Sequence, residues 1–128
     1  MARGTVLIAD DDTAIRTVLN QALARAGYAP RATGNAATLW RWVSQGEGDV
    51  VLTDVVMPNM DGYELFTTVR ERWPDLPILM MTAFHYDRDH VIKRSRMEGL
   101  AGVIFKKPVD PDRLRAALGD ALGKRGTS

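Results

Sequence analysis

The sequence predicts an α/β fold: one domain in which five β-strands, each followed by a helix, form a parallel sheet. Segments typical of strands and of helices alternate five times along the chain. The expected strands are continuous apolar runs and not alternations of apolar and polar residues, which indicates that helices cover both faces of the sheet. The length of 128 residues is typical of a single domain with its own core.

The first half of the chain contains three expected strands and two helices. The first strand is rich in β-branched residues, and the helix after it has apolar residues at helical spacing and a stop at Gly27. The elements are expected at Thr5–Ala9 (strand), 13–26 (helix), Ala29–Thr33 (a weak strand), from after Gly34 or Asn35 to Gly46 (helix) and 49–53 (strand).

The second half begins with a break at Pro58, after which Asp61 is expected to start a helix. The last helix has an aspartate at its start and Pro111 in its first turn, which is a typical helix beginning. The elements are expected at 61–73 (helix), 77–82 (strand), 87–98 (helix), 102–105 (strand) and 110–122 (helix). The domain is therefore expected to span residues 1–123, with residues 124–128 a disordered tail or the start of a linker.

The composition excludes several classes of protein. The chain has no cysteine, which excludes disulfides and cysteine–zinc sites. Its apolar runs are far shorter than the roughly 20 residues that cross a bilayer, and its N-terminus lacks a secretory apolar segment. A net charge of +1 gives no general attraction to nucleic acid. We therefore expect a cytoplasmic domain that binds neither membranes nor nucleic acid directly.

Polar side chains follow four of the five expected strands. In parallel sheets ligands bind outside the carboxyl ends of the strands. Clustered carboxylates repel one another there, and their commonest use is to hold a hard cation such as Mg²⁺. A carboxylate can also attack phosphorus, while a hydroxyl and an ammonium group bind phosphoryl oxygens. The strand ends carry Asp10, Asp11 and Asp12, then Asp54, then Thr82, and then Lys106 and Lys107.

Several of these polar and aromatic residues also have a purely structural interpretation. Asp12 is better explained as the N-cap of the first helix than as a metal ligand. Asp61 more simply starts a helix, and Thr53 more simply fills a strand end. The three tryptophans are more often packing residues than part of a cofactor site.

Short motifs at these strand ends resemble those of the receiver domains of two-component response regulators. No single motif is specific, but all four occur in order at the matching strand ends, over nearly the whole chain. The fold implied is the flavodoxin-like (CheY-like) three-layer sandwich with strand order 2-1-3-4-5. The motifs are LIADD at 7–11, LTDVVMP at 52–58 with MDG at 60–62, MTA at 81–83, and FKKP at 105–108.

The resemblance implies a Mg²⁺ site and a phosphoacceptor. Asp54 would accept the phosphoryl group, and Asp10 and Asp11 would hold Mg²⁺ together with Asp54 and the backbone carbonyl of Val56. Among the remaining residues of the motifs, Thr82 would contact the phosphoryl group.

Lys107 would pair with the phosphoryl group, because it is the lysine directly before the proline. The phosphodonor would be a histidine kinase or a phosphotransfer protein. The chain would be a signalling domain and not an enzyme, taking part only in its own phosphotransfer and slow dephosphorylation.

The first half most resembles the nitrogen-regulation (NtrC-type) regulators, in DDDTAIR at 10–16 and ATLWRWV at 37–43. By that resemblance, ATPase and DNA-binding output domains absent from this chain would follow. A homodimer could form through the face that holds the helix at 87–98, the strand at 102–105 and the helix at 110–122.

The sequence departs from the receiver pattern at two places. The loop at 84–90 is longer than usual, and the position three before Lys107 is Ile104, where an aromatic residue that rotates on phosphorylation is common. Phe84 and Tyr86 are substitute candidates for that aromatic residue. The positions that influence attack by water are Val56 and Phe84, and both are apolar, which predicts slow loss of the phosphoryl group.

Two other functions compete with the phosphorylation switch. The first is a degenerate receiver that acts only as a docking or dimerisation module, against which the complete set of motif residues argues. The second is a flavodoxin-like enzyme or nucleotide binder. No glycine-rich loop follows the first strand, as phosphate binding by backbone amides would require.

Overall fold

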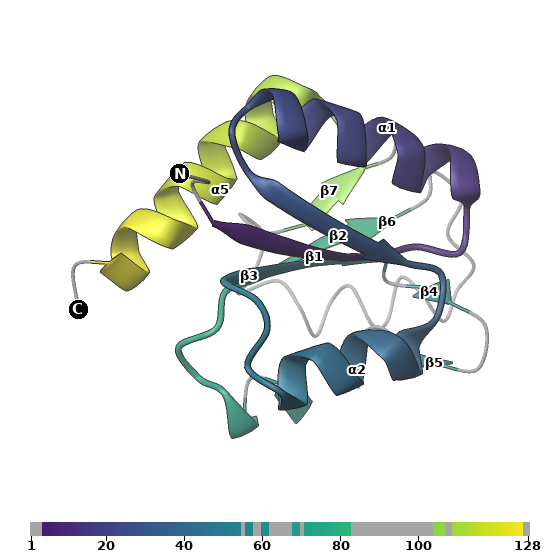
Figure 1. Cartoon of the computed structure of the whole chain (residues 1–128), viewed down its shortest axis with the longest axis vertical. Helices are drawn as coiled ribbons and strands as arrows, with labels where there is room; N and C mark the ends of the chain where they lie inside the picture. Colours follow the sequence, from purple (N-terminus) through teal and green to yellow (C-terminus); the bar gives the residue numbers. More distant parts are fainter. Residues whose placement is uncertain are drawn as a thin grey trace.

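A five-stranded parallel sheet forms the centre of the molecule in the computed structural model (Figure 1), which describes residues 4–54, 56–57, 60–61, 68–69, 71–82, 104–106 and 109–126. The strand order is β2-β1-β3-β6-β7, and every neighbouring pair is parallel. This confirms the predicted order of the five strands. The strands are β1 (Thr5–Ala9), β2 (Ala29–Thr33), β3 (Val50–Asp54), β6 (Ile78–Thr82) and β7 (Ile104–Lys106).

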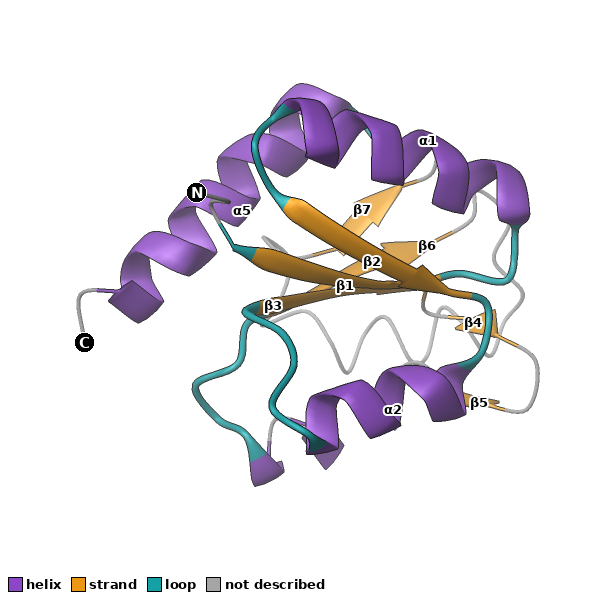
Figure 2. Ribbon diagram, in the orientation of Figure 1, coloured by secondary structure: helices purple, strands orange, loops and turns teal. Residues whose placement is uncertain are grey.

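Helices cover both faces of this sheet, as the continuous apolar strands predict (Figure 2). Successive side chains of a strand point to opposite faces, so Val6 and Ile8 face the layer of α1 (Thr13–Arg25) and α5 (Pro111–Gly126), while Leu7 faces the layer of α2 (Ala36–Ser44). Both faces are buried along residues 6–9 of β1 and along all of β3, whereas β2 forms a partly exposed edge.

The first two helices begin and end as the sequence predicts. Asp12 and Asn35 are the N-caps of α1 and α2, and each side chain accepts two backbone N–H bonds of its helix. Gly27 and Gly46 follow the two C-caps with φ angles of 93° and 74°. Glycine reaches this left-handed region at low cost, so both residues end their helices efficiently.

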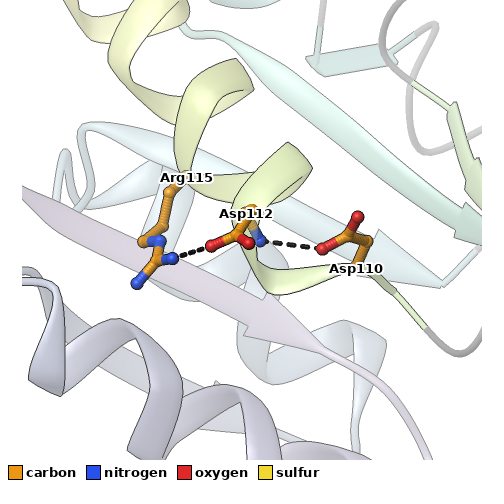
Figure 3. A network of polar contacts seen from close by, with 3 residues as sticks. All are labelled: Asp110, Asp112 and Arg115. Carbon is orange, nitrogen blue, oxygen red and sulfur yellow. Dashed lines mark hydrogen bonds and ion pairs between the residues drawn. The ribbon is translucent and has the colours of Figure 1, made fainter.

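The start of α5 shows how an exposed helix end is satisfied locally (Figure 3). The Asp110 carboxylate accepts a hydrogen bond from the Asp112 N–H at 3.0 Å, and Pro111 occupies the first helical position, as predicted. Arg115 forms an ion pair with Asp112 one turn earlier. Both side chains are well exposed, so the pair contributes little to stability.

The C-terminal end of α5 lies beyond the predicted boundary. The helix continues to Gly126, whereas the sequence places its end at residue 122 and a disordered tail after residue 123. Gly123 is not among the described glycines with positive φ, so it continues the helix. The predicted helix end is therefore wrong, and the first residues of the expected tail are helical.

A second correction concerns Asp61. The structure contains a small antiparallel ladder of β4 (Val56–Met57) and β5 (Met60–Asp61), in which Asp61 pairs with Val56. The prediction that Asp61 starts a helix is therefore wrong. The described helical residues of this part are 68–69 and 71–72, and the Trp73 N–H donates to the Val69 carbonyl at 2.7 Å where this helix ends.

The tryptophans are packing residues, as predicted. Trp42 is 8% exposed and belongs to the core on the α2 face of the sheet. Trp40 and Trp73 pack against the same core. Their two rings meet edge to face, with centroids 5.5 Å apart.

No helix in the described part of the chain is both long and apolar enough to span a bilayer. The helix expected at 87–98 lies outside the described residues.

Candidate metal centre

Three carboxylates gather at the carboxyl end of the sheet. Asp10 directly follows β1, Asp54 is the last residue of β3, and these two strands are neighbours with Ala9 opposite Thr53. Together with Asp11 they offer carboxylate oxygens that all lie within 4.8 Å of one another. Asp10 and Asp54 are buried and Asp11 is exposed, so the cluster reaches solvent at Asp11.

Asp10 forms hydrogen bonds through its N–H, its carbonyl and its carboxylate. Its N–H donates to the Thr33 carbonyl of β2 at 3.1 Å. Its carbonyl accepts a bond of 2.6 Å from the Nη1 atom of Arg16. Its Oδ1 atom accepts a bond of 2.9 Å from the Asp12 N–H, which closes a tight turn after the strand. Asp10 is therefore hydrogen-bonded to both β2 and α1.

Asp12 serves the helix, which confirms the structural interpretation of this residue. Its Oδ1 atom accepts hydrogen bonds from the N–H groups of Ala14 and Ile15, at 2.9 and 3.4 Å. It is exposed, and it is not part of the carboxylate cluster. Thr53 is likewise structural: it is fully buried, and its hydroxyl donates to the Asp54 carbonyl at 3.2 Å.

The donor set of the cluster fits Mg²⁺. Mg²⁺ prefers oxygen ligands and usually keeps several waters, so it binds through a few carboxylates at a solvent-accessible place. Two buried carboxylates and one exposed carboxylate meet both conditions. Ionised carboxylates at this separation repel one another by roughly 1 to 4 kcal/mol per pair, depending on how well water screens them. A divalent cation would offset that repulsion.

The other predicted site residues are only partly described. Thr82 ends β6 and pairs with Lys106 of β7, so its backbone lies at the same end of the sheet as Asp54, whose partner in β6 is Met81. Val56 lies two residues after Asp54, in β4. Lys107, Phe84 and Tyr86 lie outside the described residues. The backbone of Ile104 belongs to β7 and pairs with that of Met80.

Arg16 is a residue of this site that the sequence pattern does not identify. It lies on the first turns of α1, where an arginine is ordinarily interpreted as solvent-exposed. Its side chain instead returns to the strand end and donates to the Asp10 carbonyl. No local pattern marks this contact, because it depends on how the loop after β1 folds back beside β2.

The comparisons with known proteins agree with this geometry. A family model described as the response regulator receiver domain matches residues 6–119. The DNA-binding transcriptional regulator NtrC of Rhizobium meliloti is 49% identical over 124 residues, which are 97% of this chain and 25% of that protein. NtrC of a Bradyrhizobium species is 64% identical over 83 residues, 65% of this chain and 17% of that protein. The chain thus spans a quarter or less of these relatives' length.

Solved structures show the same fold. Full-length FixJ from B. japonicum superposes with a TM-score of 0.81 at 29% identity, over 98% of this chain and 60% of that one. A response regulator from Chloroflexus aurantiacus, described as putative, gives a TM-score of 0.77 at 31% identity, over 94% and 98% of the two chains. With its family match, its relatives and its strand-end carboxylates, the chain belongs to the receiver domains of two-component response regulators, and its sequence is similar to the matching part of NtrC regulators.

Proposed function

We propose that Asp54 of this receiver domain accepts a phosphoryl group from a histidine kinase or a phosphotransfer protein in a Mg²⁺-dependent reaction. The observation that carries the proposal is the position of Asp54: it ends the central strand β3, and its carboxylate lies within 4.8 Å of those of Asp10 and Asp11. This is the position that the family motifs assign to the phosphoacceptor.

The reaction forms one bond and breaks one bond. A carboxylate oxygen of Asp54 attacks phosphorus, the bond from phosphorus to the donor's leaving atom breaks, and an acyl phosphate remains on Asp54. Mg²⁺ bound by Asp10, Asp11, Asp54 and the Val56 carbonyl would supply positive charge to the transferring group. Thr82 and Lys107 would bind the phosphoryl oxygens.

The consequence of phosphorylation would be a change of partner or oligomer contacts and not turnover of an external substrate. The NtrC-type relatives are longer DNA-binding regulators. We therefore infer a cytoplasmic role in transcription regulation, in which this domain controls output domains and its own self-association. The face that includes β7 and α5 is the proposed contact surface, as in the sequence-based expectation.

The test is labelling by acetyl phosphate, followed by intact-mass spectrometry. The wild-type domain should gain one phosphoryl group in Mg²⁺ and none in EDTA. Asp54→Ala should gain none under either condition. Asp120→Ala is the matched control, because Asp120 is an exposed aspartate of α5 outside the cluster, and it should be labelled like the wild type.

The degenerate receiver is the alternative that this experiment separates. A wild-type domain that is folded but gains no phosphoryl group in Mg²⁺ would contradict the proposal and leave docking as the function. Labelling that persists in Asp54→Ala would contradict the choice of acceptor. Peptide mapping of the labelled protein would then locate the carboxylate that is used.

A further inference from the structure

We propose that Arg16 is a positioning residue for the metal centre, which holds the peptide between Asp10 and Asp11 so that their carboxylates face Asp54. This inference rests on the proposed function, since it concerns how that site is assembled. It is carried by a connected set of contacts among the end of β1, the start of α1 and the turn after β2.

The guanidinium of Arg16 is held at two of its nitrogens. Nη1 donates to the Asp10 carbonyl at 2.6 Å, and Nη2 donates to the Thr13 hydroxyl at 3.1 Å. Arg16 is half-buried, so the first bond is partly protected from water. A hydrogen bond from a charged donor is shorter and stronger than one between neutral groups. The planar fork of arginine makes both bonds with one fixed orientation, which a lysine cannot do.

The turn after β2 leaves space for this guanidinium. A Cβ atom on Gly34 would lie 2.6 Å from Nη1 and 3.3 Å from Cζ of Arg16, whereas its distance of 3.6 Å to the Asp10 carbonyl oxygen would be an ordinary contact. Gly34 is not among the described glycines with positive φ, so its backbone does not require glycine. The absence of a Cβ at position 34 therefore makes room for the arginine, and the turn itself does not require it.

The two sides of Asp10 are thereby fixed by different elements. Its N–H is bonded to the Thr33 carbonyl of β2, and its carbonyl is bonded to Arg16 of α1. That carbonyl belongs to the peptide plane that joins Asp10 to Asp11. Rotation of this plane would swing the Asp11 carboxylate relative to the two buried ones. The Arg16 bond therefore restricts the position of the exposed ligand.

If Arg16 acted only through its charge, its removal would change the Mg²⁺ affinity in the opposite direction. Removing a positive charge near a cation site should strengthen binding of the cation, because their repulsion is lost. Removing a bond that positions the ligands should weaken it. Residues that orient metal ligands typically contribute about 10- to 100-fold in affinity. The sign of the change in Mg²⁺ affinity thus separates the two roles.

The experiment is a double-mutant cycle on Mg²⁺ affinity, measured by titration calorimetry. We compare the wild type with Arg16→Gln, Gly34→Ala and the double variant. Arg16→Gln should weaken Mg²⁺ binding about 10-fold. Gly34→Ala keeps the positive charge of Arg16 but displaces its guanidinium. This variant should therefore also bind Mg²⁺ more weakly than the wild type. The double variant should be no weaker than Arg16→Gln alone, because both changes remove one contact.

Three further measurements keep the result unambiguous. Urea unfolding in EDTA shows that each variant is folded at the titration temperature. Arg25→Gln is the matched control, since Arg25 is an exposed arginine at the far end of the same helix, and it should bind Mg²⁺ like the wild type. Arg16→Lys should restore part of the affinity, because one of the two bonds can be remade.

Unchanged or tighter Mg²⁺ binding in Arg16→Gln would overturn the positioning role, as would additive losses in the double variant. These outcomes leave the proposed function intact if the wild type still binds Mg²⁺ and is labelled at Asp54. A wild type that does neither would instead contradict the proposed function itself.

Discussion

Asp10, Asp11 and Asp12 are neighbours in the chain, yet their carboxylates have three different surroundings. Asp10 is buried at the strand end, Asp11 is the exposed member of the carboxylate cluster, and Asp12 caps α1. The direction of the chain changes between the strand and the helix, so the three side chains point in different directions. The three positions should therefore respond differently to substitution.

Substitutions at Asp11 and Asp12 should have opposite signatures. Asp12→Ala should lower the free energy of unfolding by about 1 kcal/mol through loss of the helix cap, and should leave Mg²⁺ affinity near its wild-type value. Asp11→Ala should abolish tight Mg²⁺ binding without lowering stability in EDTA, because it removes one charge from a repelling cluster. Urea unfolding in EDTA and calorimetry measure the two properties. Equal losses of Mg²⁺ affinity in the two variants would contradict this division of roles.

The lifetime of the phosphoryl group is a second property set by single residues. Val56 and Phe84 offer no group that could hydrogen-bond an attacking water, so we expect the purified phosphoprotein to decay over minutes or longer. Val56→Asn should shorten the half-life, because an amide can orient a water and the backbone carbonyl is retained. Phosphate release followed over time measures it, with the exposed Val18 changed to Asn as the control. A wild-type half-life of seconds would show the expectation to be wrong.

At the scale of elements, the difference between predicted and observed boundaries has a physical origin. The core strands and the caps of α1 and α2 follow from local signals: apolar runs, Asp12 and Asn35 as caps, and Gly27 as a stop. Gly123 carries the same signal as Gly27 but continues its helix. Whether a glycine stops a helix depends on the φ angle that the following chain imposes, which the residue itself does not determine.

The β4–β5 ladder also could not be predicted from the sequence. Two-residue strands have no periodicity to detect, and an aspartate such as Asp61 is a residue type favoured at helix N-caps. The candidate site is different. Parallel pairing of β1 with β3 brings Asp10 and Asp54 together although they are far apart in the sequence, and this pairing follows from the fold class. Arg16 could not be predicted, since its contact depends on the turn at Gly34.

Two glycines outside the site should respond to alanine in opposite ways. Gly119 lies on the exposed side of α5, and no atom of the described residues lies within 4 Å of the place that an added Cβ would take. Gly119→Ala should therefore stabilise the protein by about 0.5–1 kcal/mol through helix propensity. A Cβ on Gly48 would lie 2.5 Å from Cδ1 of the buried Leu7, so Gly48→Ala should destabilise by roughly 1–3 kcal/mol through overpacking. Urea unfolding of both variants checks this, and a shift of the same sign in both would contradict it.

For the molecule as a whole, the acidic cluster and the core act in opposite directions. The sheet is buried between two helical layers, while the carboxylates at its end repel one another in the absence of a cation. Any cation that binds only the folded state shifts the unfolding equilibrium by mass action. Binding of a cation by these three side chains would therefore be coupled to global stability.

The stability of the domain should rise with Mg²⁺ concentration. At a concentration of about 100 times the dissociation constant, the free energy of unfolding should increase by about 2.7 kcal/mol. The increase should vanish in Asp11→Ala, and monovalent salt at equal ionic strength should give only a small part of it. Urea unfolding at a series of Mg²⁺ concentrations measures the effect. Equal stabilisation of the wild type and Asp11→Ala would show that it arises from screening and not from binding at this site.

The exposed strand β2 has a consequence for how copies of the domain meet. The Ala29 N–H donates to the Gly4 carbonyl at 2.9 Å and so faces the interior of the sheet. Successive residues of a strand present their amides to opposite sides, so the backbone nitrogen that faces outward next belongs to Pro30, which has no hydrogen to donate. The charged side chain of Arg31 follows it. An extended segment from another molecule would lack one backbone donor at this edge, which disfavours pairing of two copies edge to edge along β2.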